Sequence, residues 1–314
     1  MEIPVDPGVI ATRRLAAVTR DGGQPLSENR RAADDLDPWI GRLVAAKIPT
    51  MPDTVISCGM VNDLAYVRSI FGARWTATSK EGRKQYEDQV LLFGPHSKFM
   101  PLTCEGHVFS AGFGLRAGAL FALTGRSCAE MLDRIAPEDT FGLLQDDLRE
   151  IHSGEHSPAE WTLAMEEAMR RFIAKNDPPP PDPVSTAFEL QAFRDPNISP
   201  ADFAEEQGIA LRTLERTVRR DFGIPPKRVL RRARALDLAA LLCGVADDAE
   251  EDELMLRYFD QSHLIREFSA FFGVTPKKFR SKPRPLLTIV LEQRQARRLE
   301  ELGRLDEGAK RPWI

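Results

Sequence analysis

The stretch SPADFAEEQGIALRTLERTVRRDF, residues 199–222, decides the fold of the last third of the chain. Its first residues, Ser199 and Pro200, are typical of a helix start, because serine caps free N–H groups and proline suits the first turn. Gly208 is typical of a helix end. A second helix is predicted over 211–222, since the apolar residues there recur with helical spacing. Two helices joined by a short glycine-containing turn predict a helix-turn-helix unit.

The second helix of this unit has a basic outer face, formed by Arg212, Arg216 and Arg219. Arginine binds guanine edges through two hydrogen bonds, and it also neutralises phosphates. The face therefore predicts a helix that enters the major groove of DNA. A solvated surface is the alternative, because exposed helix faces are usually charged.

A second unit is predicted from ELMLRYFDQSHLIREFSAFF, residues 253–272. Asp260 can cap its second helix, and Gly273 and Pro276 follow the expected helix end. We expect the inward side chains of that helix to be Leu264, Ile265, Phe268 and Phe272. The outward ones are then Gln261, Ser262, His263 and Arg266, which can all form hydrogen bonds with bases or phosphates.

One long helix, predicted over 226–243, separates the two units. At about 1.5 Å per residue it spans about 25 Å, so with the adjoining helices it can hold two recognition helices about one DNA turn apart. The net charge of the chain is −4, yet residues 209–234 contain nine Lys or Arg and only two acids. This local excess of positive charge favours nucleic-acid binding.

The residues of both units resemble those of AraC/XylS-type transcription regulators. The phrases that carry the resemblance are FAEEQGIALRTLER (203–216), YFDQSHLIREF (258–268) and FGVTP (272–276). The resemblance covers residues 195–282. It implies an all-helical domain that contacts two consecutive major-groove segments of promoter DNA, with RNA polymerase as a further partner.

The matched motifs show which residues of this chain correspond to the positions that read bases in the family. They are Arg212, Glu215 and Arg216 in the first unit, and Gln261, Ser262, His263 and Arg266 in the second. Thr213, Arg219 and Arg231 complete the predicted DNA-binding set. The chain departs from the family at Ala210, where a Ser cap is usual, at Val218, where Phe is common, and at Arg257, where the second turn usually has Gly.

The N-terminal part is predicted to be β-rich. Short segments rich in Val, Ile, Phe and Thr, punctuated by Gly and Pro, favour a small barrel or sandwich with strands at 54–58, 65–70, 74–78, 89–93 and 107–113. The segments LFGPH (92–96), FSAGFGLRAG (109–118) and LDRIAP (132–137) are similar to the cupin-like N-terminal domain of some AraC-type proteins. Such domains sense a ligand or mediate dimerisation, so a small-molecule effector and a homodimer are expectations from the resemblance.

The predicted fold class is α+β, with a β-rich cupin-like domain and helical connector followed by an all-α tandem helix-turn-helix domain. The helical connector is predicted over 126–175, and the run NDPPPPDP (176–183) predicts a stiff spacer. The predicted organisation is a flexible arm at 1–37, a sensor or dimerisation domain at 38–176, a linker at 177–186, a DNA-binding domain at 187–285 and an exposed tail helix at 286–314.

No arrangement of residues predicts an enzyme, a metal site or a cofactor. The spacing of residues shows no Ser-His-Asp, Cys-His or paired-carboxylate pattern. The motif GxGxxxG at 112–118 is one residue too long for a dinucleotide loop. His152 and His156 have metal-compatible spacing, but Gly154 and Pro158 would break the helix they need. A catalytic cupin with a DNA anchor is the rival from another class, and it would have only His96 and His107 within 38–125 as imidazole ligands.

Composition agrees with a reduced cytoplasmic protein. Hydrophobic residues make up 42% and charged residues 29% of 314, as in ordinary globular domains. The four cysteines form no CxxC pair, and no stretch is apolar enough to span a membrane. A second alternative function is that of a partner-binding protein that no longer recognises DNA. An acidic surface over both recognition helices would favour this alternative.

Overall fold

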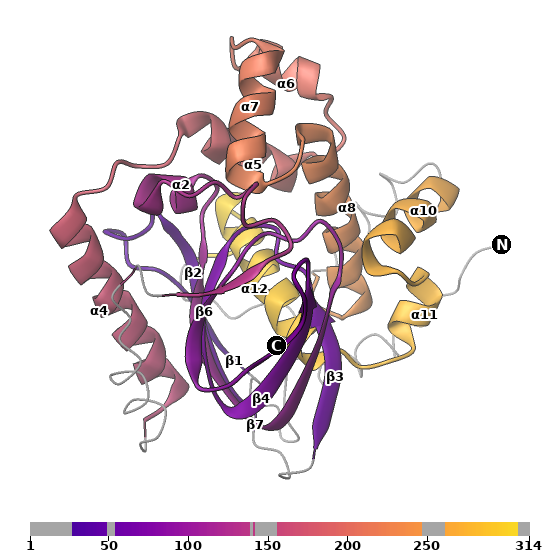
Figure 1. Cartoon of the computed structure of the whole chain (residues 1–314). Helices are drawn as coiled ribbons and strands as arrows, with labels where there is room; N and C mark the ends of the chain where they lie inside the picture. The colour runs from indigo at the N-terminus through magenta and orange to yellow at the C-terminus, as the bar shows by residue number, and fades with distance from the viewer. Residues whose placement is uncertain (1–26, 49–53, 139–140, 142–155, 247–260, 307–314) are drawn as a thin grey trace.

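A computed structural model of the chain describes residues 27–48, 54–138, 141, 156–246 and 261–306. A β-sheet built by the N-terminal part is followed by a helical C-terminal part, which confirms the predicted α+β class (Figure 1). The strands are β1 (Ser27–Arg31), β2 (Ile40–Ile48), β3 (Val55–Met60), β4 (Tyr66–Ser79), β5 (Gly82–Tyr86), β6 (Gln89–Phe93), β7 (Met100–Leu115) and β8 (Ile135–Pro137).

All pairings in the sheet are antiparallel, in the order β1-β2-β7-β4-β6-β8, with β3 on β7 and β5 on β4. β4 and β7 pair with each other along most of their length, and the register shifts between Phe71 and Ala73. Gly72 lies at this shift with φ +75°, a conformation that is open to glycine. The segments 65–70 and 74–78, predicted as two strands, are therefore one strand interrupted by a bulge.

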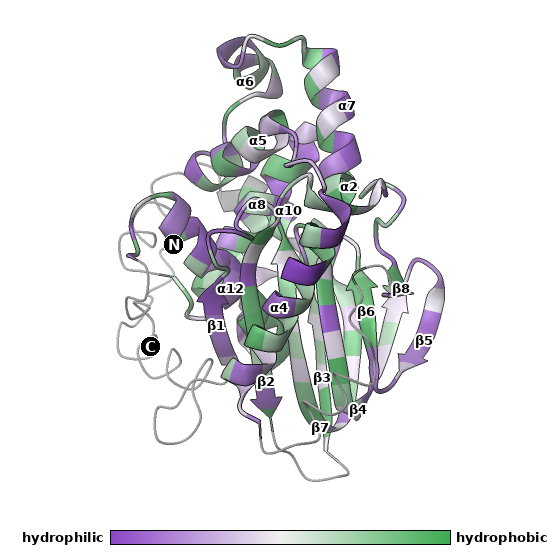
Figure 2. Cartoon of the chain, turned by 90° about the vertical axis from the view of Figure 1, so that its left-hand side faces the viewer, coloured by the Kyte–Doolittle hydropathy of each residue, from purple (hydrophilic) through white to green (hydrophobic). Residues whose placement is uncertain are grey.

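One face of the sheet is covered by α4 (Pro158–Asn176), and the short helix α2 (Ala119–Thr124) packs into the same core (Figure 2). Ser157 caps α4, because its side chain accepts a hydrogen bond from the N–H of Glu160. Trp161, Met165 and Met169 of α4 are buried on this face. Burying one such side chain contributes about 1.5–3 kcal/mol to folding.

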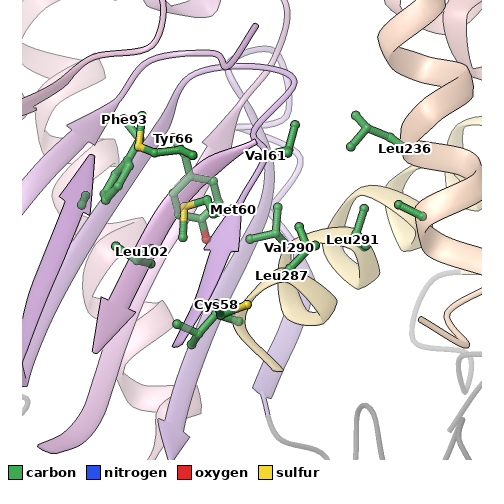
Figure 3. Packing of buried hydrophobic residues seen from close by; sticks show 14 of the residues in the cluster. Cys58, Met60, Val61, Tyr66, Phe93, Leu102, Leu236, Leu287, Val290 and Leu291 are labelled. Atoms are coloured by element: carbon green, nitrogen blue, oxygen red, sulfur yellow. The ribbon is translucent and has the colours of Figure 1, made fainter. Parts of the chain in front are cut away.

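The other face of the sheet is covered by α12 (Pro285–Glu301), which lies between the sheet and α8 (Pro226–Leu242). Figure 3 shows Leu287 and Val290 of α12 near Cys58 of β3, and Leu291 toward Leu236 of α8. These residues belong to one hydrophobic cluster that runs from the sheet into the C-terminal helices. The β-sheet and the C-terminal helices thus share a core.

The predicted exposed tail helix is therefore wrong for residues 285–301. Its many charges are buried because partners on other elements neutralise them. Arg294 donates to Asp237 of α8 (Nη1–Oδ1 2.6 Å) and to Asp63 (Nε–Oδ2 3.0 Å). Arg297 pairs with Glu189 over 2.7 Å. Charge along a sequence indicates a solvated face only where such partners are absent.

The flexible arm predicted at 1–37 is wrong for residues 27–37, whereas 1–26 lie outside the described residues. Ser27–Arg31 form β1, which pairs with β2, and Leu36 is buried. Polar side chains stabilise this edge: Arg30 donates to Glu166 of α4 over 2.7 Å. Because the pairing uses main-chain groups and ion pairs, hydrophobic periodicity does not indicate it.

Two further boundaries differ from prediction. Residues 126–137 hold turns and β8, which pairs with β6, in place of the start of a helical connector. The predicted linker 177–186 ends early, since Asp182 caps a helix that begins at Pro183. Trp39 donates to the carbonyl of Pro179 at 3.0 Å, which fixes the spacer to the sheet domain. The apolar segment 143–151 lies outside the described residues.

The C-terminal part is helical. Besides α8 and α12 its described helices are α5 (Pro183–Arg194), α6 (Pro200–Glu206), α7 (Leu211–Phe222), α10 (Gln261–Phe272) and α11 (Pro276–Arg280). The predicted first helix of the second unit, with Leu254, Met255 and Tyr258, and the cap Asp260 lie outside the described residues. None of the described helices has the length and apolar character needed to cross a membrane.

Candidate nucleic-acid interface

The first unit has the predicted helix-turn-helix geometry. The Ser199 hydroxyl accepts from the N–H of Asp202 at 3.1 Å and caps α6. Gly208 adopts φ +63°, and the N–H of Ile209 donates to the carbonyl of Ala204 at 3.0 Å across the turn. Ala210 gives α7 no side-chain cap, because a methyl group cannot accept a hydrogen bond. The start of α7 therefore leaves N–H groups for solvent or for a phosphate.

The core of this unit contains α5, which extends the predicted pair of helices. The Phe188 ring of α5 lies 5.0 Å from that of Phe203 on α6 and 5.8 Å from that of Phe222 on α7. Leu214 and Val218 of α7 are fully buried beside them. Edge-to-face aromatic pairs of this kind contribute about 0.5–1.5 kcal/mol beyond area burial. The buried stripe fixes which side of α7 faces outward.

The outward side of α7 carries the predicted DNA-binding residues. Arg212, Glu215, Arg216 and Arg219 are exposed and Thr213 is half-buried. Arg220, next to them in sequence, is instead held inside the protein, because it donates to Asp221 and Asp182. The structure thus brings the predicted residues of the first unit together on one helical face at the top of Figure 1.

In the second unit, Phe268 and Phe272 of α10 lie inward as predicted and Leu264 is half-buried, but one predicted inward residue lies outside. Phe268, Phe271, Phe272 and Glu267 are buried, whereas Ile265 is 43% exposed, so its predicted inward position is wrong. The Phe268 ring lies 4.5 Å from that of Phe272 and 5.1 Å from that of Phe279 on α11. Arg266 is exposed as predicted. The predictions for the side chains of Gln261, Ser262 and His263 lie outside the described residues.

The contact between α8 and α10 rests on Glu267, which the sequence analysis did not single out. Arg234 donates to both of its carboxylate oxygens, at 3.0 and 2.9 Å, and Arg231 donates to Oε1 at 2.9 Å. Arg231 therefore has a partner inside the protein, and a DNA contact by this side chain stays a prediction. Glu267 is 2% exposed, and no local signal in the sequence indicates that its carboxylate lies inward, because its partners lie 36 and 33 residues away along the chain.

Other exposed basic residues adjoin the two recognition helices. They are Lys227 and Arg228 at the start of α8, Lys277 and Lys278 on α11, and Lys282 after it. Their exposure and position beside the predicted face suit contacts to phosphates, which need charge without precise base geometry. In the sequence, Lys227 and Arg228 were evident only as part of the local excess of positive charge over residues 209–234.

Of the histidines considered as metal ligands, His96 and His107 have partners within the fold, whereas His152 lies outside the described residues. His96 is fully buried, and burial lowers the pKa of its imidazole to about 4. His107 stacks on Phe109 with ring centroids 6.1 Å apart. In the part of the chain that the structure describes, no group of three or more His, Cys, Asp or Glu could hold a metal ion. Trp75, Tyr86, Phe93 and Phe113 are core residues, the role that aromatics usually have in a β-rich domain.

Residues 203–282 match the model of a family described as a helix-turn-helix domain. The matched range contains α7, α10 and the helix between them, whereas residues 199–202 at the start of the first unit precede it. The C-terminal part of the chain is a helix-turn-helix domain of the AraC type, and this kind of domain binds DNA.

The solved structures that match the chain include a single-residue variant of apo ToxT from Vibrio cholerae, with a TM-score of 0.47 and 10% identity over 77% of this chain and 97% of that one. Wild-type ToxT from the same organism, bound to an unsaturated fatty acid, matches with a TM-score of 0.44 and 11% identity, over 76% of this chain and 94% of that one. The AraC-like transcriptional activator CuxR matches with a TM-score of 0.31 and 10% identity, over 89% of this chain and 97% of that one. No curated protein matches the chain in sequence.

Proposed function

We propose that the chain regulates transcription by binding promoter DNA at two successive major-groove segments, one entered by α7 and the other by α10. The observation that carries this proposal is the exposed basic face of α7, which lies directly opposite the buried stripe of the same helix. A helix with this division can insert its basic side into a groove while its apolar side stays packed.

Residue roles follow from hydrogen-bonding chemistry. Arg212 and Arg216 suit guanine, and Glu215 can accept from the amino group of cytosine. Arg219 suits a phosphate beside the first segment. In the second segment Arg266 is the described base-reading candidate, together with Gln261, Ser262 and His263 of the same helix. Lys277 and Lys278 of α11 would neutralise phosphates next to it.

RNA polymerase is a further partner in this proposal, because a protein bound beside a promoter can recruit the polymerase or exclude it according to the position of its site. A small-molecule effector and a homodimer belong to the same proposal as expectations for the β-rich part. Thermal unfolding with candidate ligands and light scattering of the full chain test these two expectations separately.

Selection of random DNA by the full chain, followed by gel-shift titration, tests the proposed function. The selected DNA is expected to bind at least a hundred times more tightly than competitor DNA at physiological salt, since specific binders usually exceed non-specific binding by ~10³ or more. The matched control is Arg171→Ala, an exposed arginine on α4 that should leave affinity unchanged. Equal affinity for selected and competitor DNA would exclude sequence-specific binding.

A further inference from the structure

The carboxyl ends of both recognition helices are held by loops of the β-sheet domain. At the end of α7, the carbonyl of Arg220 accepts from the N–H of Cys128 at 2.7 Å and from the hydroxyl of Ser127 at 3.1 Å. At the end of α10, the carbonyl of Phe271 accepts from the N–H of Phe99 at 2.8 Å. The last carbonyls of a helix lack partners within the helix. These bonds satisfy such carbonyls and hold the carboxyl end of each recognition helix against a loop of the β-sheet domain.

The two loops that make these bonds are joined to each other. The carboxylate of Asp133 accepts from the N–H of Ser97 at 2.7 Å and from its hydroxyl at 2.5 Å. The N–H of Asp133 donates to the carbonyl of Pro95 at 2.9 Å. The contact is close: a Cβ on Gly94 would lie 1.8 Å from the carbonyl oxygen of Met131. We call residues 94–99 and 127–134 together the loop bridge.

The loop bridge also contacts the turn after α7 and the helix between the two units. A Cβ on Gly223, which follows α7, would lie 2.9 Å from the carbonyl oxygen of Cys128 and 3.2 Å from Pro95 Cγ. The end of α7 therefore sits between the two loops. The buried guanidinium of Arg232 on α8 donates to the carbonyl of His96 at 2.9 Å. The bridge thus contacts α7, α8 and α10 at once.

We propose that Asp133 is a positioning residue for DNA recognition: by joining the two loops, it fixes the separation and relative rotation of α7 and α10. This inference rests on the proposed function, in which both helices read one site. A side chain on the β-sheet domain would then determine which spacing between two DNA segments the chain accepts. The Glu267 ion pairs hold α10 on α8, and the loop bridge holds the far ends of both helices.

The backbone at Asp133 decides which substitution isolates the carboxylate. Asp133 has φ +58°, so Asp133→Gly removes the side chain in a conformation that glycine adopts freely. Asp133→Asn keeps an acceptor for the N–H of Ser97, and asparagine also tolerates this region. Ser97→Ala removes the hydroxyl bond but keeps the bond from the backbone N–H, so it takes away one of the two bonds to the carboxylate. The matched control is Asp88→Gly, because Asp88 also has positive φ, +43°, and accepts a backbone N–H, that of Gly72 at 3.1 Å.

The experiment measures the affinity of the full chain for its selected DNA site and for sites with one base pair inserted or deleted between the two segments. One base pair rotates the second segment by about 35° and moves it by about 3.4 Å. The affinity of the unmodified chain and of Asp88→Gly is expected to be at least tenfold lower for the altered sites than for the selected site. The affinity of Asp133→Gly is expected to fall threefold or less on the altered sites, and that of Ser97→Ala by a factor between those of Asp133→Gly and the unmodified chain, whereas Asp133→Asn should restore most of the discrimination.

Each result has one meaning for the inference. If the unmodified chain binds the selected site and rejects altered spacing, but Asp133→Gly and Ser97→Ala reject it equally, the inference is overturned while the proposed function stands. If the unmodified chain binds no DNA specifically, the proposed function fails first. Thermal unfolding of every variant identifies a folding defect, and if Asp133→Gly does not fold, Ser97→Ala decides.

Discussion

Arg234 of α8 donates two parallel hydrogen bonds to the carboxylate of Glu267 of α10, Nη2–Oε1 at 2.9 Å and Nε–Oε2 at 3.0 Å. Glu267 is 2% and Arg234 15% exposed, so water screens this pair weakly. The same guanidinium donates through Nη1 to the carbonyl of Pro196 at 2.7 Å, in the segment before α6. One side chain therefore connects α8 to the second helix-turn-helix unit and to the segment that leads into the first.

Replacing Glu267 by Gln tests this contact. Glutamine has nearly the same shape but no charge, so the buried guanidinium of Arg234 loses its counter-ion. We expect unfolding free energy to fall by about 2–3 kcal/mol, less than the full cost of an uncompensated buried charge, because one acceptor oxygen remains. Denaturant titration measures the change. Glu206→Gln, an exposed change on α6, is the control and should shift stability by under about 0.5 kcal/mol. Equal effects of both changes would contradict the structural role.

Arg216 and Arg266 are predicted to read different DNA segments. Arg216→Ala and Arg266→Ala should each cost about 1–3 kcal/mol of binding and relax base preference in one segment only. The measurement is repeated selection of random DNA with each variant. A uniform loss of affinity across all sequences would mean that both arginines contact phosphates only.

The elements of the first unit could be predicted from the sequence because local signals decide them. Ser199, Pro200 and Gly208 set helix ends through their own backbone chemistry, and Leu214, Val218 and Phe222 set the buried side of α7 through helical spacing. These signals act within a few residues, so no knowledge of the rest of the fold is needed.

The remaining features depend on contacts between distant residues. Glu267 meets Arg234, Asp133 meets Ser97 and Arg294 meets Asp237, none of which are close in sequence. The outer position of Ile265 was mispredicted because Phe271 and Glu267 take the inward side of α10. Likewise α12 has the charge pattern of a solvated helix, and only its partners on β2, α5 and α8 explain its burial.

Arg294 should stabilise the shared core. Arg294→Met keeps the apolar stem but leaves Asp237, 3% exposed, without its cation. We expect a loss of about 3–5 kcal/mol in unfolding free energy. Arg171→Met, whose side chain is 61% exposed on α4, is the matched control and should cost about 0–1 kcal/mol. The double variant Arg294→Met with Asp237→Asn should recover part of the loss, and failure to recover any would argue against the ion pair as the cause.

His96 should make the fold sensitive to acid. Its pKa is lowered to about 4 because burial disfavours the charged ring, and the nearby cations Arg232 and Arg68 lower it further while Asp133 opposes them. As pH falls below about 6.5, the unfolded chain takes up a proton that the folded chain refuses until about pH 4, so stability is lost across this window. The loss reaches about 3 kcal/mol at pH 4, and none arises above pH 7.

His96→Asn tests the acid effect. Asparagine can replace the ring Nδ1, which lies 3.2 Å from the carbonyl of Met60, and it does not titrate. Denaturant titrations from pH 7.5 to pH 4.5 should show a smaller loss of stability for the variant than for the unmodified chain. Parallel curves would mean that other groups cause the acid sensitivity.

Hydroxyl-radical footprinting of the full chain on its selected DNA tests whether α7 and α10 read successive segments. Two protected clusters are expected, with centres about one helical turn, 10–10.5 base pairs, apart on one face of the duplex. Arg216→Ala should weaken one cluster and Arg266→Ala the other. A single protected cluster, or protection that both substitutions weaken equally, would contradict the claim that α7 and α10 read successive segments.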